Sequence, residues 1–283
     1  MNNDYLLKLF ELEKISQLLY KLTGNTVDIN KKEMLSSRWG KLLRELNLSP
    51  ETSFINNLNI IEKNHSQNFI NRYTTNTTYF FREIGQMNWM YDNLDIIKES
   101  SGKLSVLCLP SSSGEEIYSL ATILNKASKE QNLIWNIDGF DISQKVLKLA
   151  NNAVYDYSKS NSKIPSQYKD SWNELFTTEI VKEHNFPDTK SYKLIKNLFN
   201  INFHHGNIME GAVNSKKYDI IFCRNMLIYF EEKEVEIIIG NLLRMLKPDG
   251  YLAIGHSETA FGHKDKLTKV SNFNIFKNSP SSI

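Results

Sequence analysis

Two adjacent carboxylates open a predicted helix in the segment SSSGEEIYSLA, directly after the apolar run KLSVLCLP. Glu115 and Glu116 would complement the helix dipole, which is worth about 0.3–1 kcal/mol, and they could also bind a cation. The loop before them has small residues but a single glycine, Gly114, and it lacks both the G-x-G-x-x-G pattern and the lysine of a P-loop. The segment therefore disfavours a pyrophosphate ligand and is compatible with a cationic one.

Polar side chains also follow three further apolar runs. Asp141, in GFDIS, comes about 25 residues after the acidic pair and could accept hydrogen bonds from ribose hydroxyls or cap the next helix. Asn207, in FHHGNIME, could read an adenine edge or serve a local turn. The run IIFCRNMLIYF ends in polar groups that make poor core material, namely Arg224, Asn225 and Tyr229.

These groups together suit a ligand that contains an adenosine, carries no phosphate and has a positive charge for carboxylates to meet. S-adenosylmethionine has these properties. Its sulfonium already activates the methyl group, so a protein that uses it mainly aligns an acceptor with that methyl group and excludes water. The sequence thus favours a methyl-transfer site.

The elements that must position this site begin after residue 100, where apolar runs alternate with amphipathic helical patterns. Strands buried on both faces and separated by helices predict an α/β fold with a doubly wound, mostly parallel sheet. Ligands bind beyond the carboxyl ends of such strands, where the polar groups above would lie. Residues 155–200 are polar and interrupt the alternation, so we expect an inserted surface subdomain there. The closing segment LTKVSNFNIFKN predicts one or two edge strands.

The first 72 residues contain helical patterns and no convincing strand. One helix ends at Gly24, a second spans the segment KKEMLSSRWGKLLRELNLSP, and a third is expected to begin near Ser49 and Pro50. The sequence therefore predicts a small all-helical domain over 1–72 and a catalytic domain over 73–283. The segment TTNTTYFFRE at 74–83 would join them, with Phe80 and Phe81 walling the site against water.

Composition excludes several classes of protein. A net charge of +2 gives no global field that would attract nucleic acid. The two cysteines, Cys108 and Cys223, lie in apolar runs, and His204 and His205 would point to opposite faces of a strand, so we expect no metal site. No run approaches the roughly 20 apolar residues of a membrane helix. We therefore expect a cytoplasmic protein without membrane insertion.

Four of these segments, TTNTTYFFRE, SSSGEEIYSLA, GFDIS and above all IIFCRNMLIYFEEKEVEIIIGNLLRMLKPDGYLAIGHSE, resemble the chemotaxis receptor methyltransferases, the CheR family. The resemblance covers nearly the whole chain in the right order. It implies a Rossmann-like class I methyltransferase domain and a protein-glutamate O-methyltransferase that acts in chemotaxis signal transduction. Such enzymes transfer a methyl group from S-adenosylmethionine to glutamate side chains of chemoreceptors, forming glutamyl methyl esters and S-adenosylhomocysteine.

The resemblance also implies site residues. The family's cofactor contacts fall on nine positions: Asn76, Thr78, Arg82, Glu116, Asp141, Asn207, Ile208, Asn225 and Met226. Glu115 stays open as the alternative to Glu116, which its spacing to Asp141 favours. Arg82 and Tyr229 would lie near the transferred methyl group and are the expected catalytic residues.

The expected acceptor requires no general base, because a glutamate with a reference pKa of about 4.3 is already ionised at pH 7. Arg82 could orient that carboxylate through its rigid donor fork. Tyr229 could offer a hydroxyl or an aromatic face to the sulfonium, a contact of about 0.5–2 kcal/mol. The alternative for Tyr229 is an ordinary core tyrosine.

The resemblance implies a chemoreceptor partner whose methylation region is an acidic helical bundle. A flank of the second helix is basic and could dock there, or it could be an ordinary solvated face: Lys31, Arg38, Lys41 and Arg44. In some family members the insertion is a β-subdomain that holds a receptor tail as an added strand. Here SWNELFTTEIVKEHNF is more helical than stranded, so tail binding is not predicted.

Two other functions compete with receptor methylation. The chain could keep the cofactor pocket for sensing or scaffolding, although the presence of Arg82, Asp141, Asn225 and Tyr229 favours catalysis. It could instead methylate a small molecule, with the helical domain serving as a lid.

Overall fold

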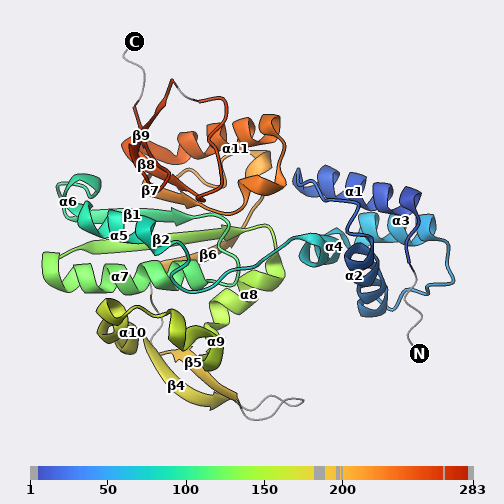
Figure 1. The fold of residues 1–283 in the computed structure, drawn as a ribbon, viewed down its shortest axis with the longest axis horizontal. Helices are drawn as coiled ribbons and strands as arrows, with labels where there is room; N and C mark the ends of the chain where they lie inside the picture. The colour runs from blue at the N-terminus through green and yellow to red at the C-terminus, as the bar shows by residue number, and fades with distance from the viewer. Residues whose placement is uncertain (1–5, 182–188, 196–197, 199, 264, 280–283) are drawn as a thin grey trace.

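The computed structural model describes residues 6–181, 189–195, 198, 200–263 and 265–279. Four helices form the N-terminal region: α1 (Leu9–Thr23), α2 (Lys32–Glu45), α3 (Phe54–Asn64) and α4 (Ser66–Tyr73). They lie together at one end of the molecule, away from the sheet (Figure 1). Their shared core is apolar and includes Leu12, Ile15, Leu19, Leu35, Trp39, Leu42, Ile61 and Phe69.

The ends of these helices follow local capping chemistry. Helix α1 ends as predicted, because Gly24 adopts the left-handed conformation with φ of 77° and its N–H reaches the carbonyl of Tyr20. The predicted start of the third helix near Ser49 is wrong. The capping residue is Ser53, whose Oγ accepts from the Asn56 N–H at 3.3 Å, and the chain before it forms a turn.

A sheet of seven described strands forms the centre of the larger region, in the order β6-β2-β1-β7-β8-β10-β9. Its strands are β1 (Lys103–Cys108), β2 (Ile134–Asp141), β6 (Ile201–His205), β7 (Tyr218–Cys223), β8 (Leu246–Ile254), β9 (Leu267–Ser271) and β10 (Ile275–Asn278). Pairs among the first five are parallel, whereas β10 pairs antiparallel with β8 and β9. The prediction of a doubly wound, mostly parallel sheet is confirmed, and the closing segment forms the predicted edge.

Helices cover both faces of this sheet (Figure 1). On one face pack α5 (Ile84–Asp92), α6 (Leu94–Ile97) and α7 (Glu115–Gln131), and on the other packs α11 (Glu232–Met245). Helix α8 (Gln144–Asn152) follows β2. Successive residues of β1 alternate between the two cores, because side chains alternate across a strand.

The segment predicted as an insertion forms a subdomain beside the main sheet. It contains β3 (Val154–Asp156), α9 (Tyr157–Ser160), η1 (Asn161–Lys163), η2 (Ser166–Tyr168), α10 (Lys169–Leu175), β4 (Phe176–Val181) and β5 (Thr189–Leu194). Its three strands pair antiparallel in the order β3-β5-β4. The expectation of a more helical than stranded segment is wrong for Phe176–Val181, which forms β4 of this second sheet, and the rest of that segment, residues 182–186, lies outside the described residues.

Aromatic packing fastens this subdomain to residues 79–83. The Phe80 ring lies 4.8 Å from the rings of both Tyr155 and Trp172, and Phe81 stacks on Tyr168 at 5.9 Å. Neither phenylalanine lines the pocket described below, so their predicted role as pocket walls is wrong. Phe80 and Phe81 instead join residues 79–83 to the inserted subdomain.

The sheet has a topological switch point between β1 and β7. The strands β2 and β6 extend the sheet on one side of β1, whereas β7 and β8 extend it on the other side. A crevice forms at such a switch point beyond the strand ends, which is where ligands bind to open α/β sheets. Within the described part of the chain, no helix is long and apolar enough to cross a membrane.

Candidate active site

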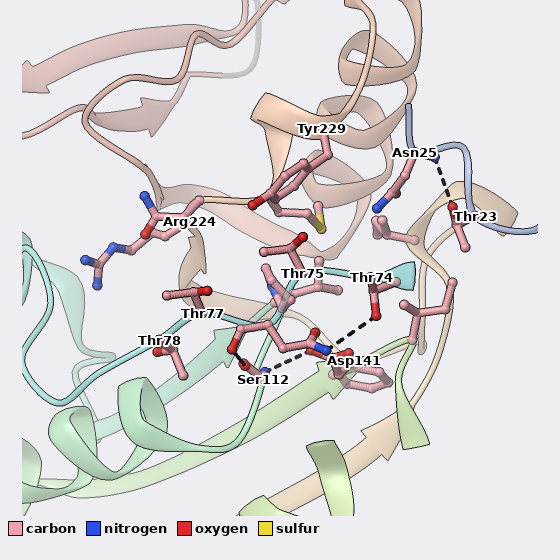
Figure 2. A pocket seen from close by; sticks show the side chains of 18 of the residues that line it. Thr23, Asn25, Thr74, Thr75, Thr77, Thr78, Ser112, Asp141, Arg224 and Tyr229 are labelled. Carbon is pink, nitrogen blue, oxygen red and sulfur yellow. Dashed lines mark hydrogen bonds between the residues drawn. The ribbon is translucent and has the colours of Figure 1, made fainter. Parts of the chain in front are cut away.

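A pocket opens at the carboxyl ends of β1, β2, β6 and β7, and the segment after α4 closes its side. Its lining includes every residue predicted for the site: Asn76, Thr78, Arg82, Glu116, Asp141, Asn207, Ile208, Asn225, Met226 and Tyr229. Glu115 does not line it. Five separate stretches of sequence thus converge on one cavity, and Figure 2 shows Tyr229 across the space from Asp141 and Ser112.

Asp141 ends β2 with its carboxylate held by the backbone. Its Oδ2 accepts from the Ser112 N–H and its Oδ1 from the Ser143 N–H, each at 2.8 Å. The side chain is almost fully buried, and burial raises the pKa of Asp141 to about 6 even though these hydrogen bonds favour the charged form. Each oxygen keeps a second lone pair, so the carboxylate can accept two hydroxyl donors. The Asp141 carboxylate is therefore fixed in orientation, and the residue directly before α8 is Ser143.

The segment before Arg82 forms the pocket's near wall. The Ser112 Oγ donates to the Asn76 carbonyl at 3.0 Å, and Asn76 Nδ2 lies 3.4 Å from Thr74 Oγ1. Thr74, Thr75, Thr77 and Thr78 supply further hydroxyls along this wall, and they are labelled in Figure 2. The loops after α4 and after β1 are therefore hydrogen-bonded to each other at the cavity.

Glu116 meets a buried arginine that the sequence analysis had noted only as a polar group. The Arg224 Nη1 lies 2.8 Å from Glu116 Oε2, off the line of a good hydrogen bond, so the contact is an ion pair. Cys108 Sγ donates to Glu116 Oε1 at 3.1 Å. Burial raises the pKa of Glu116, and the Arg224 charge opposes that rise. Glu116 thus lines the cavity with its charge already partly balanced.

Asn225 is held by two carboxylates, those of Glu83 and Glu258. Its Nδ2 donates to Glu83 Oε1 at 3.0 Å, and its backbone N–H donates to Glu258 Oε2 at 2.9 Å. Arg224 Nη2 also lies 3.4 Å from Glu83 Oε2. Burial disfavours the charged form of Glu83, but the hydrogen bond from Asn225 and the charge of Arg224 outweigh it and leave the pKa of Glu83 below its ordinary value. Glu83 and Glu258 therefore position Asn225.

Left-handed backbone conformations gather around these loops. Phe81, Glu83, Ser112 and Asn225 have φ values of 55°, 49°, 48° and 56°. Such conformations cost about 1–3 kcal/mol for a residue other than glycine and concentrate where the surrounding structure fixes a functional geometry. Two of them flank Arg82, so its main chain is tightly specified.

The Arg82 guanidinium reaches the pocket without an ion pair among the described residues. Its Nη1 donates to the Thr77 carbonyl at 2.9 Å, and its Cζ lies 5.6 Å from the centre of the Tyr79 ring. Its own carbonyl accepts from Arg224 Nη2 at 2.5 Å. The buried arginine therefore anchors the backbone of the pocket arginine, whose remaining donors stay available for an anion.

The helical region contributes to the same cavity, which sequence patterns did not indicate. Thr23 and Asn25, at the end of α1, both line it. The Thr26 N–H and Oγ1 bind the Tyr229 carbonyl at 2.7 and 3.1 Å, so this loop holds η4 (Leu227–Tyr229) from behind. Tyr229 is half-buried, and its side chain points into the space in Figure 2.

Asn207 keeps the local role that its position after a glycine suggested. Its Oδ1 accepts from the Met209 N–H at 3.0 Å and begins η3 (Ile208–Glu210). Its Nδ2 is long and poorly placed in the two contacts that it makes, at 3.5 Å to the Leu22 carbonyl and 3.4 Å to Glu210. The Oδ1 contact therefore fixes the amide group, while its Nδ2 donor is only weakly engaged.

The family model for the "CheR methyltransferase, SAM binding domain" matches residues 76–275. The chain belongs to the CheR methyltransferase family. It is 31% identical over 259 residues to the "Chemotaxis protein methyltransferase" of Escherichia coli, covering 89% of this chain and 85% of that one. It is 29% identical to the protein of the same name from Borreliella burgdorferi, covering 90% of each.

Solved structures outside the family are more distant. PKMT2 from Rickettsia typhi matches with 13% identity and a TM-score of 0.38, over 63% of this chain and 26% of that one. A likeness at this level adds nothing to the family match. Family membership makes the chain a methyltransferase whose cofactor is S-adenosylmethionine and whose product is S-adenosylhomocysteine.

The pocket suits that cofactor on its own chemistry. It combines a buried carboxylate with two free lone pairs, a row of threonine hydroxyls and an amide at the far strand end. Apolar side chains that could enclose an adenine alternate with these groups: Leu109, Phe140, Ile142, Ile208, Met226 and Phe230. The described lining residues include no histidine or lysine.

Proposed function

We propose that this enzyme transfers the methyl group of S-adenosylmethionine to glutamate side-chain carboxylates of chemoreceptors, forming glutamyl methyl esters during chemotaxis adaptation. The observation that carries the proposal is Arg82, a guanidinium on the pocket wall that has no carboxylate partner in the described structure. A glutamate acceptor would supply that partner. The test is transfer of label from methyl-labelled S-adenosylmethionine to receptor-bearing membranes as a base-labile ester.

Asp141 is the proposed ligand of the ribose hydroxyls, and its fixed carboxylate supports that role. Asn207 and Ile208 are the proposed adenine contacts, and Asn225 and Met226 are further proposed cofactor contacts in the same cavity. Four further lining residues are proposed cofactor contacts, and they include the charged groups of the set: Asn76, Thr78, Arg82 and Glu116. Glu116 is preferred to Glu115 because it lines the cavity, whereas Glu115 accepts from Ser113 Oγ at 2.6 Å outside it.

S-adenosylmethionine supplies, when bound, a methyl group on a positive sulfonium; the methyl carbon bonds to the acceptor oxygen as its bond to sulfur breaks. Arg82 holds the acceptor carboxylate through paired N–H donors, which limits its rotation and aligns one oxygen. No proton needs to be removed, because the acceptor is ionised at neutral pH. Tyr229 covers the reacting region with its ring and hydroxyl and excludes water.

The acceptor would be a cytoplasmic helical bundle, and the enzyme would act in the cytoplasm. Helix α2 is the proposed docking element. Lys41 and Arg44 on α2 and Lys31 directly before it are exposed, and no described carboxylate forms an ion pair with them. Arg38 differs, because its Nη1 donates to the Tyr73 carbonyl at 2.7 Å and burial lowers its pKa. Arg38 therefore holds the end of α4, and docking falls to the three exposed cations.

The division into domains fits these roles. Residues 1–72 would form the docking domain and residues 73–283 the catalytic domain, with 155–200 as an inserted subdomain. The helical part is not a separate lid in the described structure, because Tyr20 Oη donates to Glu234 of α11 at 2.5 Å and Thr26 binds Tyr229. These contacts favour a fixed docking platform over a lid that opens for a small molecule.

A further inference from the structure

Two cations from distant parts of the chain converge on one exposed tyrosine at the edge of the pocket. Tyr79 is 43% exposed, and its ring centre lies 5.6 Å from Arg82 Cζ and 5.3 Å from Lys163 Nζ. Arg82 belongs to the pocket wall, whereas Lys163 ends η1 in the inserted subdomain. The insertion therefore places a second positive charge beside the proposed acceptor arginine.

Buried contacts hold the backbone near both Tyr79 and Lys163. Phe80, next to Tyr79, packs against Tyr155 and Trp172, so the active-site segment is fixed to the insertion. On the other side, the buried Tyr192 of β5 donates its hydroxyl to Asn161 Oδ1 at 2.7 Å and so anchors η1 two residues before Lys163. Buried aromatic side chains thus fix both elements, through ring packing at Phe80 and through a hydrogen bond at Asn161.

Their charges are unbalanced. No described carboxylate lies within ion-pair distance of Lys163 or Arg82, whereas Lys159, four residues before Lys163, pairs with Asp156 at 3.7 Å. The sum of the two ring distances, about 11 Å, is the most that can separate the cations, and it is close to a Debye length of about 8–10 Å. Two like charges so close repel each other, and anions bound between or beside them would relieve that repulsion.

We infer that Tyr79 and Lys163 form a second anion subsite, which selects acceptors with another carboxylate close to the methylated glutamate. This inference rests on the proposed function, because it assigns the first carboxylate to Arg82. An α-helix rises about 5.4 Å per turn, so the second acid would lie one or two turns along the receptor helix from the acceptor. The tyrosine ring beside the cations would pack against the stem of that side chain.

The test compares Lys163→Gln with Lys159→Gln, a matched exposed lysine on the same subdomain that has a carboxylate partner and lies away from Tyr79. Steady-state methylation of receptor-bearing membranes is measured for both variants and for Lys163→Arg. Lys163→Gln should raise KM for the receptor by about threefold to tenfold, with kcat and cofactor affinity unchanged, as expected for a charge at the rim of an interface. Lys163→Arg should behave like the wild type.

A variant receptor completes a double-mutant cycle with these enzymes. In this receptor, the acidic residues one and two turns from the methylated glutamate are replaced by glutamine. The wild-type enzyme should lose the same factor on this receptor, and Lys163→Gln should lose nothing further. Equal KM values for Lys163→Gln and Lys159→Gln on the natural receptor would overturn the inference and leave the proposed function intact. Wild-type enzyme that methylates no receptor would instead overturn the proposed function itself.

Discussion

Arg224 Nη1 lies 2.8 Å from Glu116 Oε2 at the wall of the pocket, and only 1% of the arginine side chain is exposed. The same guanidinium reaches Glu83 and the carbonyl of Arg82. One buried cation thus connects the helix after β1, the loop after β7 and the segment that carries the proposed acceptor arginine. These contacts let one cation fix the relative positions of three parts of the pocket wall.

Replacing Arg224 with Met should be strongly destabilising. It would leave Glu116 buried without its cation, and loss of one partner from a buried ion pair costs about 3–5 kcal/mol. Urea unfolding would measure the loss. Arg72→Met is the control, because Arg72 pairs with Glu45 at the surface, where such pairs contribute about 0–1 kcal/mol. Equal losses in the two variants would show that the buried pair does not hold this region.

Asp141 should make cofactor affinity depend on pH. Its pKa of about 6 means that the carboxylate takes up a proton as pH falls through 6, and the protonated form accepts fewer hydrogen bonds from a ribose. Calorimetry should show wild-type affinity falling between pH 7 and pH 5. Asp141→Asn should bind about tenfold to a hundredfold more weakly at pH 7 and should vary little over that range. Wild-type affinity that stays constant from pH 7 to pH 5 would remove Asp141 from the cofactor site.

The raised pKa of Asp141 also determines how the folding stability of the cofactor-free protein changes with pH. A carboxyl whose folded pKa lies above its ordinary value of 3.8 binds its proton more tightly in the folded state. Its contribution to stability is therefore complete below pH 3.8 and is lost as pH rises through about 6. Asp141 costs folding stability at neutral pH, as expected for a buried group kept for binding.

Arg82→Ala should reduce methyl transfer by about a hundredfold or more, because a group that aligns the reacting oxygen acts on the transition state. Arg82→Lys keeps the charge but lacks the paired N–H donors of a guanidinium, so its rate should lie between those of the wild type and Arg82→Ala. Single-turnover rates at saturating cofactor would separate this effect from weaker cofactor binding. Arg244→Ala, an exposed arginine on α11, is the control and should retain the wild-type rate. Near-normal turnover in Arg82→Ala would exclude Arg82 from the mechanism.

Receptor docking on α2 should depend on ionic strength. The double variant Lys41→Gln/Arg44→Gln should raise KM for the receptor several-fold and flatten its salt dependence, because exposed charges are screened within about 8–10 Å. The control is Lys14→Gln/Lys21→Gln, which removes two charges from α1. If wild-type activity is independent of salt and both double variants match it, α2 is not the docking surface.

Sequence patterns located the pocket because its residues follow apolar strands, and parallel strands end at one edge of a sheet. Asp141, Asn207 and Asn225 could be found in this way, since polar groups at strand ends are recognisable without any contact information. Whether each binds the cofactor stays a prediction. The patterns failed where tertiary contacts decide. Nothing local indicates that Thr23 lines the cavity, because the docking of α1 against η4 brings it there.

The inserted subdomain shows why strand predictions fail in polar segments. Residues 169–181 contain charges at helical spacing, and the helix does form as far as Leu175. From Phe176 the chain becomes a strand, because Phe176 packs on Trp172 at 4.2 Å and the backbone pairs with β5. Likewise, Phe80 and Phe81 were expected in the pocket since they flank its residues in sequence. Only the packed structure shows that their rings bind the insertion.

Methyl transfer to receptors tests the central proposal most directly. The enzyme would be incubated with methyl-labelled S-adenosylmethionine and receptor-bearing membranes, with Arg82→Ala in parallel, and the labelled receptor would then be treated with mild base. We predict that wild-type enzyme labels the receptor and that mild base releases this label as methanol. With Arg82→Ala, almost no label should appear on the receptor. Wild-type enzyme that binds the cofactor but leaves the receptor unlabelled would contradict the proposal and favour a sensing or scaffolding protein.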